Sequence, residues 1–430
     1  MRRLQAVPAL LAVLALVAAT CTGDEGGGAN GGNAQTQEPV TLDFWLFEAG
    51  DLSGSVLDQI KQGFEAANPN VDLEITLYPE DNYGVKLDTA IAAGKTPDLV
   101  LVYGPEQMRA GLLLPLDDMV AEHEIDLSTY VPSVVQPGDE FSCAYEDHLY
   151  CLGSYAGSVQ LIYNKDLFDA AGIPHPAPWP PMTPEEFVDI ACQLTDEENG
   201  VWGATADGPL AYLPYETFFS DDGRTAEFNS AEAVHQVEVL ASGYERGCIP
   251  SSNILDPWNT DYLVSGELGM LITGFQGLTK IENAGINYGT TGSPSPVGEE
   301  PYFFVWTDSI GVMSSSEHPD AAMDFVAFLT TEGQRIRFEV AGDMPLDLAT
   351  ADEVNWAGGI PGREDGLEVL SHARTAIFVP NRGDVMGPFD DAWGFVLAGE
   401  KSAQEALDDA NPAIQENLDK AWEDWEEGAP

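Results

Sequence analysis

Along the first hundred positions, hydrophobic residues alternate between strand-like and helix-like spacing. Val40 to Leu46 alternates apolar and polar residues, whereas Ser55 to Asn68 repeats its apolar residues every three or four positions. Leu99 to Val102 is wholly apolar, which is typical of a parallel strand covered on both faces. The predicted elements are strands at 40–46, 71–77 and 99–102, with helices at 55–68 and 85–93 between them. This order predicts a doubly wound α/β half-domain.

The stretch from Tyr150 to Ile173 separates this half-domain from the rest of the chain. A run of small and hydroxyl-bearing residues leads into Val159 to Tyr163, which predicts a buried strand because it is apolar, β-branched and aromatic. A short helix, Leu167 to Ala171, is predicted next, with Asp166 as its N-cap and Gly172 as the residue that ends it.

The remaining pattern is mostly helical. Further helices are predicted at 184–194, 230–244, 258–265, 319–330, 332–341, 366–375, 388–398 and 402–425, and a further strand at 268–273. Prolines at 294, 296 and 301 precede a second connecting segment, Phe303 to Val312, which we expect to return the chain to the first half-domain.

The residues from Ala156 to Ile173, AGSVQLIYNKDLFDAAGI, resemble the first inter-lobe crossover of the sugar-type extracytoplasmic solute-binding proteins, the maltose-binding protein family. Other blocks follow in the family's order and cover almost the whole chain after the N-terminal segment. They are FEAANPNVDLEI (64–75), KLDTAIAAGKTPDLVLV (86–102), MTPEEFVDIACQLT (182–195), VSGELGMLITGFQG (264–277), HPDAAMDFVAFLTTEGQ (318–334) and LAGEKSAQEALDDA (397–410).

This resemblance implies two doubly wound α/β lobes joined by a hinge of several crossovers, the type II periplasmic binding protein fold. The implied N-terminal lobe spans 39–152 and 308–348, and the implied C-terminal lobe spans 153–307 and 349–430. The implied function is that of a binding protein for an ABC importer. A monomer would close on a mono- or oligosaccharide in the cleft between the lobes and deliver it to the membrane permease.

Length and charge agree with a large exported protein. A chain of 430 residues is too long for one core, so two lobes are expected on size alone. The chain carries 72 acidic and 17 basic residues, a formal net charge of −55, which leaves no basic surface to meet nucleic acid. Such charge repels itself at low salt, so we interpret the surface as adapted to salt-rich surroundings.

The N-terminus predicts an export signal over residues 1–20. Arg2 and Arg3 precede an apolar run from Ala9 to Val17 and a small-residue cleavage site before Cys21. Cys21 and the flexible linker to Glu38 resemble a bacterial lipoprotein anchor, which would hold the protein on the outer face of the cell membrane. A plain secretory signal is the alternative, because Ala18 and Thr20 depart from the usual lipoprotein pattern.

Four further cysteines predict two disulfides, since an exported chain with an even number of cysteines tends to pair them. Cys143 and Cys151 flank a predicted hairpin, while Cys192 and Cys248 are associated with two predicted helices. Three pairings are possible, and we prefer 143 with 151 and 192 with 248. The spacings do not suit a zinc site, so no metal is predicted.

Sugar sites combine aromatic faces, which cover the C–H surface of the ring, with polar groups that bond the hydroxyls. Residues of both kinds follow the predicted strands and lie in the connecting segments, several at positions where the family contacts ligand. The candidate ligand-binding residues are Phe47, Glu48, Tyr103, Glu106, Tyr155, Tyr215, Trp258, Phe275, Gln276, Trp306 and Asp308. Trp306 and Asp308 stand out, because the second connecting segment is narrow and is expected to face the cleft.

Other functions remain as alternatives. The sequence has no nucleophile elbow, phosphate loop or metal-ligand motif, so we predict no enzymatic activity and no cofactor. A secreted glycoside hydrolase would need two carboxylates at a fixed separation, and abundant acidic residues are no evidence for them. The same fold could instead bind a polyamine, which suits an acidic cleft, or ferric iron, for which the expected histidine ligands are lacking.

Overall fold

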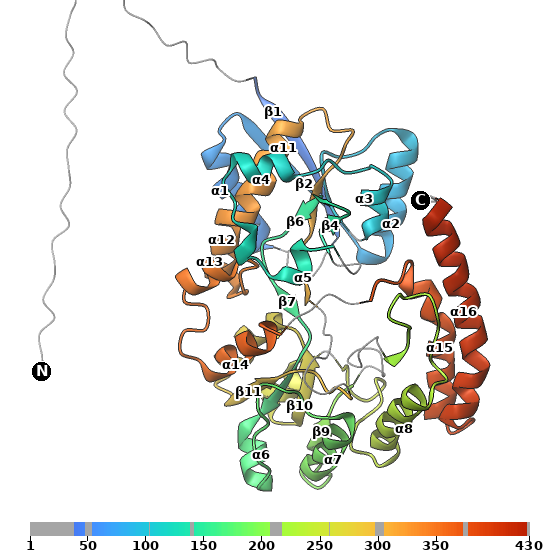
Figure 1. Cartoon of the computed structure of the whole chain (residues 1–430). Helices are drawn as coiled ribbons and strands as arrows, with labels where there is room; N and C mark the ends of the chain where they lie inside the picture. The colour runs from blue at the N-terminus through green and yellow to red at the C-terminus, as the bar shows by residue number, and fades with distance from the viewer. Residues whose placement is uncertain are drawn as a thin grey trace, which may run out of the picture. The chain divides into compact units, whose positions relative to one another are not determined.

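The computed structural model describes residues 38–47, 54–102, 104–137, 142–206, 217–257, 259–296, 305–372 and 377–427. The predicted signal peptide, the linker and Cys21 lie outside these ranges. Two main sheets with separate helical covers form the framework of the described chain (Figure 1). The described part of the chain contains no helix that combines the length and the hydrophobicity needed to cross a bilayer.

The first sheet has five strands in the order β2-β1-β3-β13-β6. These strands are β1 (Val40–Phe47), β2 (Val71–Tyr78), β3 (Leu99–Leu101), β6 (Cys151–Leu152) and β13 (Ile310–Val312). Strand β1 pairs in parallel with both β2 and β3, whereas β13 runs antiparallel to β3 and to β6. The predicted strand-helix-strand order over residues 40–101 is therefore confirmed.

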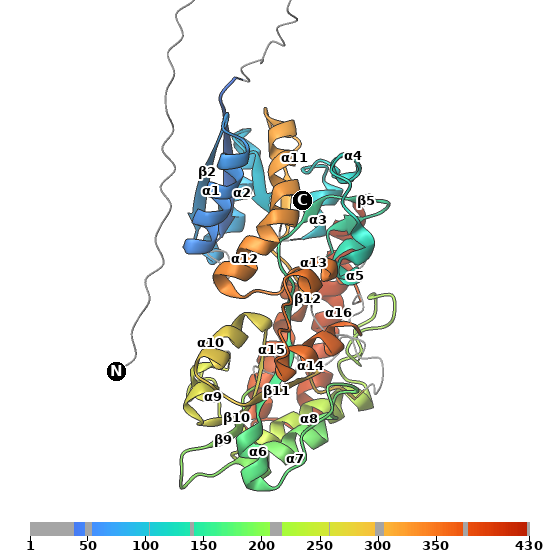
Figure 2. The same ribbon diagram turned by 90° about the vertical axis from the view of Figure 1, so that its left-hand side faces the viewer.

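The helices that cover this sheet bury the apolar residues from which they are predicted. They are α1 (Ser55–Ala67), α2 (Glu80–Ala93), α11 (Pro319–Phe328) and α12 (Gln334–Ala341), and Figure 2 shows them beside the strands. On α1 the buried residues include Ile60 and Phe64, and the Phe64 ring meets the Phe325 ring edge-on at 5.0 Å. Packing of this face, rather than intrinsic propensity, supplies most of the stability of such a helix. Helix α2 begins at Glu80, five residues before the predicted start. The prediction missed its first turn because the residues there are mostly polar and give no apolar repeat.

The second sheet has four strands in the order β11-β8-β10-β9. They are β8 (Gln160–Asn164), β9 (Trp202–Ala204), β10 (Leu268–Thr273) and β11 (Tyr288–Thr291). Every residue of β8 and β10 is buried, as expected for central strands with both faces covered. Strands β9 and β11 were not predicted, since each is short and contains glycine.

The helices around the second sheet include a long C-terminal pair. They are α6 (Lys165–Ala171), α7 (Pro184–Leu194), α8 (Ala231–Glu245), α9 (Asp261–Ser265), α10 (Leu278–Asn283), α14 (Pro361–Leu370), α15 (Arg382–Leu397) and α16 (Ala403–Glu427). The predicted N-cap of α6 is wrong. Asn164, not Asp166, caps it, and its side chain accepts from two backbone N–H groups in the first turn. Gly172 ends α6 in the left-handed conformation, as predicted.

Helix α15 begins at Arg382, six residues before the predicted start at Pro388. The prediction placed Pro388 in the first turn of the helix, where a proline is tolerated because its missing N–H would have no helical partner. Inside α15, Pro388 removes the hydrogen bond that the carbonyl of Asp384 would accept. The side-chain amide of Asn417, on α16, donates to that carbonyl at 3.1 Å instead. A tertiary contact thus compensates for the proline.

Several short elements complete the framework. They are α3 (Pro105–Arg109), α4 (Asp117–Glu122), α5 (Pro132–Val135), α13 (Leu348–Glu353) and the hairpin of β4 (Ala144–Tyr145) and β5 (His148–Leu149). Disulfides join Cys143 to Cys151 and Cys192 to Cys248, the pairing that the sequence analysis prefers. The first disulfide closes the base of the hairpin, and the second ties α7 to the end of α8.

The chain leaves the first sheet for the second through β7 (Gly157–Ser158) and returns through β12 (Val305–Trp306). These two short strands pair antiparallel. A third segment, 342–347, runs beside them, because the backbone N–H of Ala156 donates to the carbonyl of Met344 at 2.8 Å. We call residues 153–158, 305–309 and 342–347 the hinge segments.

Candidate ligand-binding site

Trp306 lies on the hinge segments with its indole ring held by two neighbours. Its Nε1–H donates to the hydroxyl oxygen of Tyr155 at 3.0 Å. The ring also covers Gly157, where an added Cβ would lie 2.4 Å from the nearest ring atom. Gly157 therefore permits the indole to approach the backbone. The structure brings Tyr155 and Trp306 together, as two of the predicted ligand-binding residues, at the point where the chain passes between the sheets.

Asp308 is close to this pair in sequence, but its carboxylate is bonded within the protein. It is 4% exposed and accepts from the backbone N–H of Ser154 at 2.6 Å and from the Ser154 hydroxyl at 2.7 Å. The Arg337 guanidinium forms an ion pair with it at 3.0 Å. Its bonding groups are thus engaged by the hinge segments and α12, so we assign Asp308 to the hinge and propose no ligand contact for it.

A cavity of about 450 Å³ lies where the first lobe meets the C-terminal helices. The first lobe contributes the loop that follows β3, together with α2 and α3. The other wall is formed by the segment before α15 and by the last turns of α16, whose end lies beside α2 and α3 in Figure 1. Because α15 and α16 also pack on α8, a helix of the second sheet's cover, the cavity lies between helices that belong to the covers of the two sheets. This edge of the first sheet holds the carboxyl ends of its parallel strands, where open α/β sheets bind ligands.

The cavity lining combines aromatic faces with charges of both signs. Its aromatic residues are Phe378 and Trp425, whose rings lie 4.8 Å apart. Its polar lining includes Asp88, Glu106, Gln107, Arg109, Arg382 and Asp424. The Arg109 guanidinium lies 4.5 Å from the centre of the Trp425 ring. Such a lining can donate to and accept from hydroxyl groups while an aromatic ring covers apolar C–H surface.

The other predicted residues are dispersed. Glu106 lines the cavity. Phe47 ends β1 and meets the Tyr83 ring edge-on at 5.6 Å. Phe275 is buried, and its ring centre lies 5.2 Å from that of Trp356 in the apolar cluster that also contains the first-sheet residues. Glu48, Tyr103, Tyr215, Trp258 and the side chain of Gln276 lie outside the described residues.

Sequence reasoning missed the contribution of the C-terminal segment to the cavity. Phe378, Arg382 and Trp425 belong to the segment before α15, the start of α15 and the last turns of α16, whereas the candidates were sought after strands and in the connecting segments. A signal was present in α16. Trp422 and Trp425 lie three residues apart on a strongly acidic helix. Two large apolar rings on one side of such a helix indicate that this side packs against another part of the molecule. Arg109 was likewise overlooked because it follows the strand-end loop by a full helical turn.

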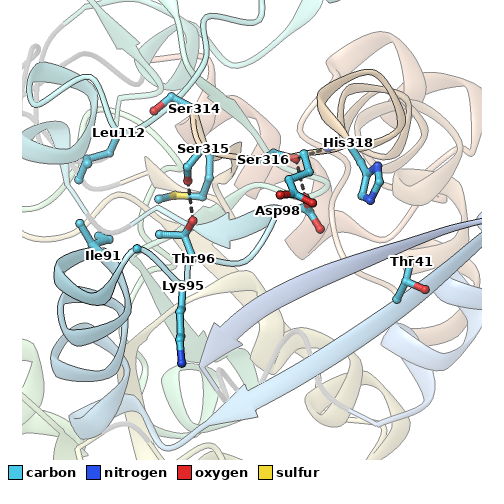
Figure 3. A pocket seen from close by; sticks show the side chains of 13 residues that line it. Thr41, Ile91, Lys95, Thr96, Asp98, Leu112, Ser314, Ser315, Ser316 and His318 are labelled. Carbon is cyan, nitrogen blue, oxygen red and sulfur yellow. Dashed lines mark hydrogen bonds between the residues drawn. The ribbon is translucent and has the colours of Figure 1, made fainter.

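A second cavity, of about 400 Å³, lies at the opposite edge of the first sheet, where the parallel strands begin (Figure 3). Most of its hydroxyl groups are paired within the protein. Thr96 bonds to Ser315, and Ser316 donates to the carboxylate of Asp98. The edge is remote from the strand-end loops, so we do not assign a ligand to it. Among the described residues, no group of three or more His, Cys, Asp or Glu side chains is placed to hold a metal ion.

Comparison with known proteins agrees with this geometry. The family model of bacterial extracellular solute-binding proteins matches residues 49–336. A binding protein from Brucella abortus (strain 2308) is 24% identical over 365 residues, covering 76% of this chain and 85% of the relative. The galactooligosaccharide-binding protein of Bacillus subtilis (strain 168) is 23% identical over 341 residues, covering 74% of this chain and 76% of the relative.

Solved structures share the fold. An ABC substrate-binding protein from Listeria monocytogenes, in complex with cycloalternan, is similar with a TM-score of 0.74 and 22% identity, covering 89% of this chain and 99% of that chain. At this identity the likeness concerns the two-lobe α/β fold. The family match spans well over half of the sequence and includes both connecting segments through the hinge. The chain therefore belongs to the family of bacterial extracellular solute-binding proteins.

Proposed function

We propose that the protein is the extracytoplasmic binding component of an ABC importer, and that it captures a mono- or oligosaccharide between its two lobes for delivery to the membrane permease. The observation that carries the proposal is the mixed lining of the 450 Å³ cavity, with two aromatic residues among carboxylates, two amides and two arginines. Carbohydrates need this mixture, since each ring has an apolar face and a belt of hydroxyls. Trp306 and Tyr155 on the hinge segments would supply further contacts.

The relatives support the same ligand class. One is described as binding galactooligosaccharide and another is complexed with cycloalternan, both carbohydrates. We further propose that the lobes are divided at 39–152 with 308–348 and 153–307 with 349–430, and that Cys21 carries a lipid anchor on the outer face of the membrane. Phe47, Glu48, Tyr103, Glu106, Tyr155, Tyr215, Trp258, Phe275, Gln276 and Trp306 remain the proposed ligand positions.

A polyamine is the main rival ligand, because the chain carries a net charge of −55. The cavity, however, places Arg109 and Arg382 beside its carboxylates. Three carboxylates and two guanidinium groups leave the lining a formal charge of −1, which is too little to balance a multiply charged cation, whereas a neutral sugar can bond to groups of both signs. The local charge therefore favours a neutral polyhydroxyl ligand over a polyamine, despite the acidic surface.

A thermal-shift screen tests this proposal. The purified protein is heated with maltotriose, a galactooligosaccharide mixture or cycloalternan, and with spermidine as the cationic comparison. A ligand at 100 times its Kd stabilises the folded state by about 2.7 kcal/mol, so a rise in Tm is expected with at least one carbohydrate. Chromatography should recover that carbohydrate intact. A rise with spermidine alone would overturn the proposed ligand class, and consumption of the carbohydrate would indicate a hydrolase.

A further inference from the structure

Arg337 joins all three hinge segments at one buried point. It belongs to α12, which packs on α1 in the first lobe. Its guanidinium reaches the first segment at Ser154, the second at Asp308 and the third at Asp343. The N–O distances to the two carboxylates are 3.0 Å and 2.9 Å. Figure 2 shows α12 lying on the first-lobe side of β12, so the arginine ties the hinge segments to that lobe.

Burial makes these bonds hard to give up. The Arg337 side chain is fully buried, and the side chains of Asp308 and Asp343 are 3% and 7% exposed. Burial alone would lower the pKa of Arg337, but the two carboxylates outweigh it and hold the pKa above its usual value. A buried guanidinium that loses a partner leaves uncompensated charge in a poorly solvated site. The arginine therefore stays charged and fixed in orientation.

A chain of contacts leads from Arg337 to Trp306. The guanidinium lies over the Tyr155 ring, 3.9 Å from its centre. The hydroxyl of the same tyrosine accepts the Trp306 indole N–H at 3.0 Å. Gly157 limits the indole on its backbone side. The guanidinium thus stacks on the phenol and the phenol hydroxyl bonds the indole, so that the position of each group depends on its neighbour.

We propose that Arg337 is a positioning residue for Trp306. Held by Asp308 and Asp343, it fixes the Tyr155 ring, and the Tyr155 hydroxyl in turn fixes the orientation of the Trp306 indole. The positioning itself stands on the contacts above, while its consequence for carbohydrate affinity rests on the proposed function. An indole fixed before the ligand arrives loses less conformational entropy on binding.

The emission spectrum of Trp306 tests the proposal without any ligand. The spectrum of this one residue is obtained by subtracting the emission of Trp306→Phe from that of the parent protein, and the subtraction is repeated in an Arg337→Lys background. Lysine keeps the charge but lacks the planar fork that bonds both carboxylates and stacks on the phenol. We expect the Trp306 emission to shift to longer wavelength and to be quenched more strongly by acrylamide.

Arg363→Lys is the matched control. Arg363 is also buried, pairs with a carboxylate at Glu282 and lies over a tryptophan ring, that of Trp356. Its replacement should lower stability without changing the Trp306 spectrum. If Arg337→Lys fails to fold by circular dichroism, Asp343→Asn decides, because that change removes one of the two ion pairs and brings the net charge of the buried cluster from −1 to zero. A folded variant with an unaltered Trp306 spectrum would overturn the proposal, as would an equal shift in the Arg363→Lys control.

Discussion

Asp43 illustrates what the high acidity of the chain means for a single residue. It lies in β1, with its backbone N–H bonded to the Asp98 carboxylate at 3.0 Å. Burial raises the pKa of Asp43, and the nearby charges of Asp98 and Glu74 add to the rise, although the hydrogen bond from Trp45 opposes it. The folded protein therefore binds a proton at Asp43 more tightly than the unfolded chain does. Its contribution to stability falls as pH rises through the raised pKa.

We accordingly expect Asp43→Asn to stabilise the protein at neutral pH. The amide oxygen can still accept from the Trp45 indole, while the repelling charge is lost. The gain should stay below about 1 kcal/mol, since the residue is only half-buried, and should vanish at pH values below the usual aspartate pKa. Urea titrations at several pH values measure it. Glu423→Gln, an exposed change of the same charge on α16, is the control, and an equal gain there would contradict the explanation.

Asp308 shows where residue-level prediction ends. Its position two residues after Trp306 made it a candidate, and the prediction placed it on the narrow return segment. The side chain that determines its environment, Arg337, is 29 positions away and belongs to a helix of the first lobe. Nothing in the local pattern distinguishes a carboxylate bonded by a buried arginine from one that faces a ligand. The ligand contact of Trp306 stays a prediction.

At the scale of elements, the two disulfides close loops of different size. Cys143 and Cys151 are separated by 8 positions, and Cys192 and Cys248 by 56. The entropy removed from the unfolded chain grows with loop length. The second bond should therefore contribute more to stability than the first.

Paired Cys→Ala substitutions test this ranking. Loss of the Cys192–Cys248 bond should cost roughly 4 kcal/mol and loss of the Cys143–Cys151 bond roughly 2.5 kcal/mol, on the chain-entropy estimate. Urea unfolding of the two double variants gives both values, and peptide mapping without reductant verifies the links in the parent protein. Equal losses would show that loop length does not govern the effect here, and four free thiols would contradict the pairing.

Elements with long apolar patterns were predictable, and elements defined by tertiary contacts were not. Strands β1 and β10 and helix α7 follow from periodicity and capping residues. The start of α15 does not, because Pro388 is tolerated in its interior only through the contact from Asn417. Strand β9 is three residues long and is identified by its partner β10 rather than by its own composition.

For the whole molecule, charge is the dominant property. A net charge of −55 on 430 residues repels itself in the compact state. Raising salt from ~0.05 M to ~1 M shortens the screening length to about 3 Å, so we expect Tm to rise substantially. Scanning calorimetry in sodium chloride measures the change, with sucrose as a control for general exclusion effects. A Tm that is constant or falls with salt would contradict adaptation to salt.

The two-lobe architecture could be predicted from the sequence, but much of the cavity could not. The order of the sequence blocks that resemble the family identifies the fold, and the loops that follow the strands identify one wall of the cavity. The other wall needs the last turns of α16 to reach the first lobe, a contact made by Trp425 with Arg109 and Tyr145. That contact depends on helix length and on the angle between packed elements, neither of which the local pattern specifies.

The most direct test of the account is a calorimetric titration of the stabilising carbohydrate into the parent protein and into Trp306→Ala, with Trp393→Ala as control. Trp393 lies on α15, where its ring packs against that of Tyr244 on α8, and it is not one of the proposed ligand positions. The parent protein should bind one carbohydrate per chain. Loss of the Trp306 ring should weaken binding by about 2 kcal/mol, roughly thirtyfold in Kd, with the control unchanged. No binding of any carbohydrate to the parent protein would contradict the account, and equal affinity in the parent and Trp306→Ala proteins would remove Trp306 from the proposed ligand positions.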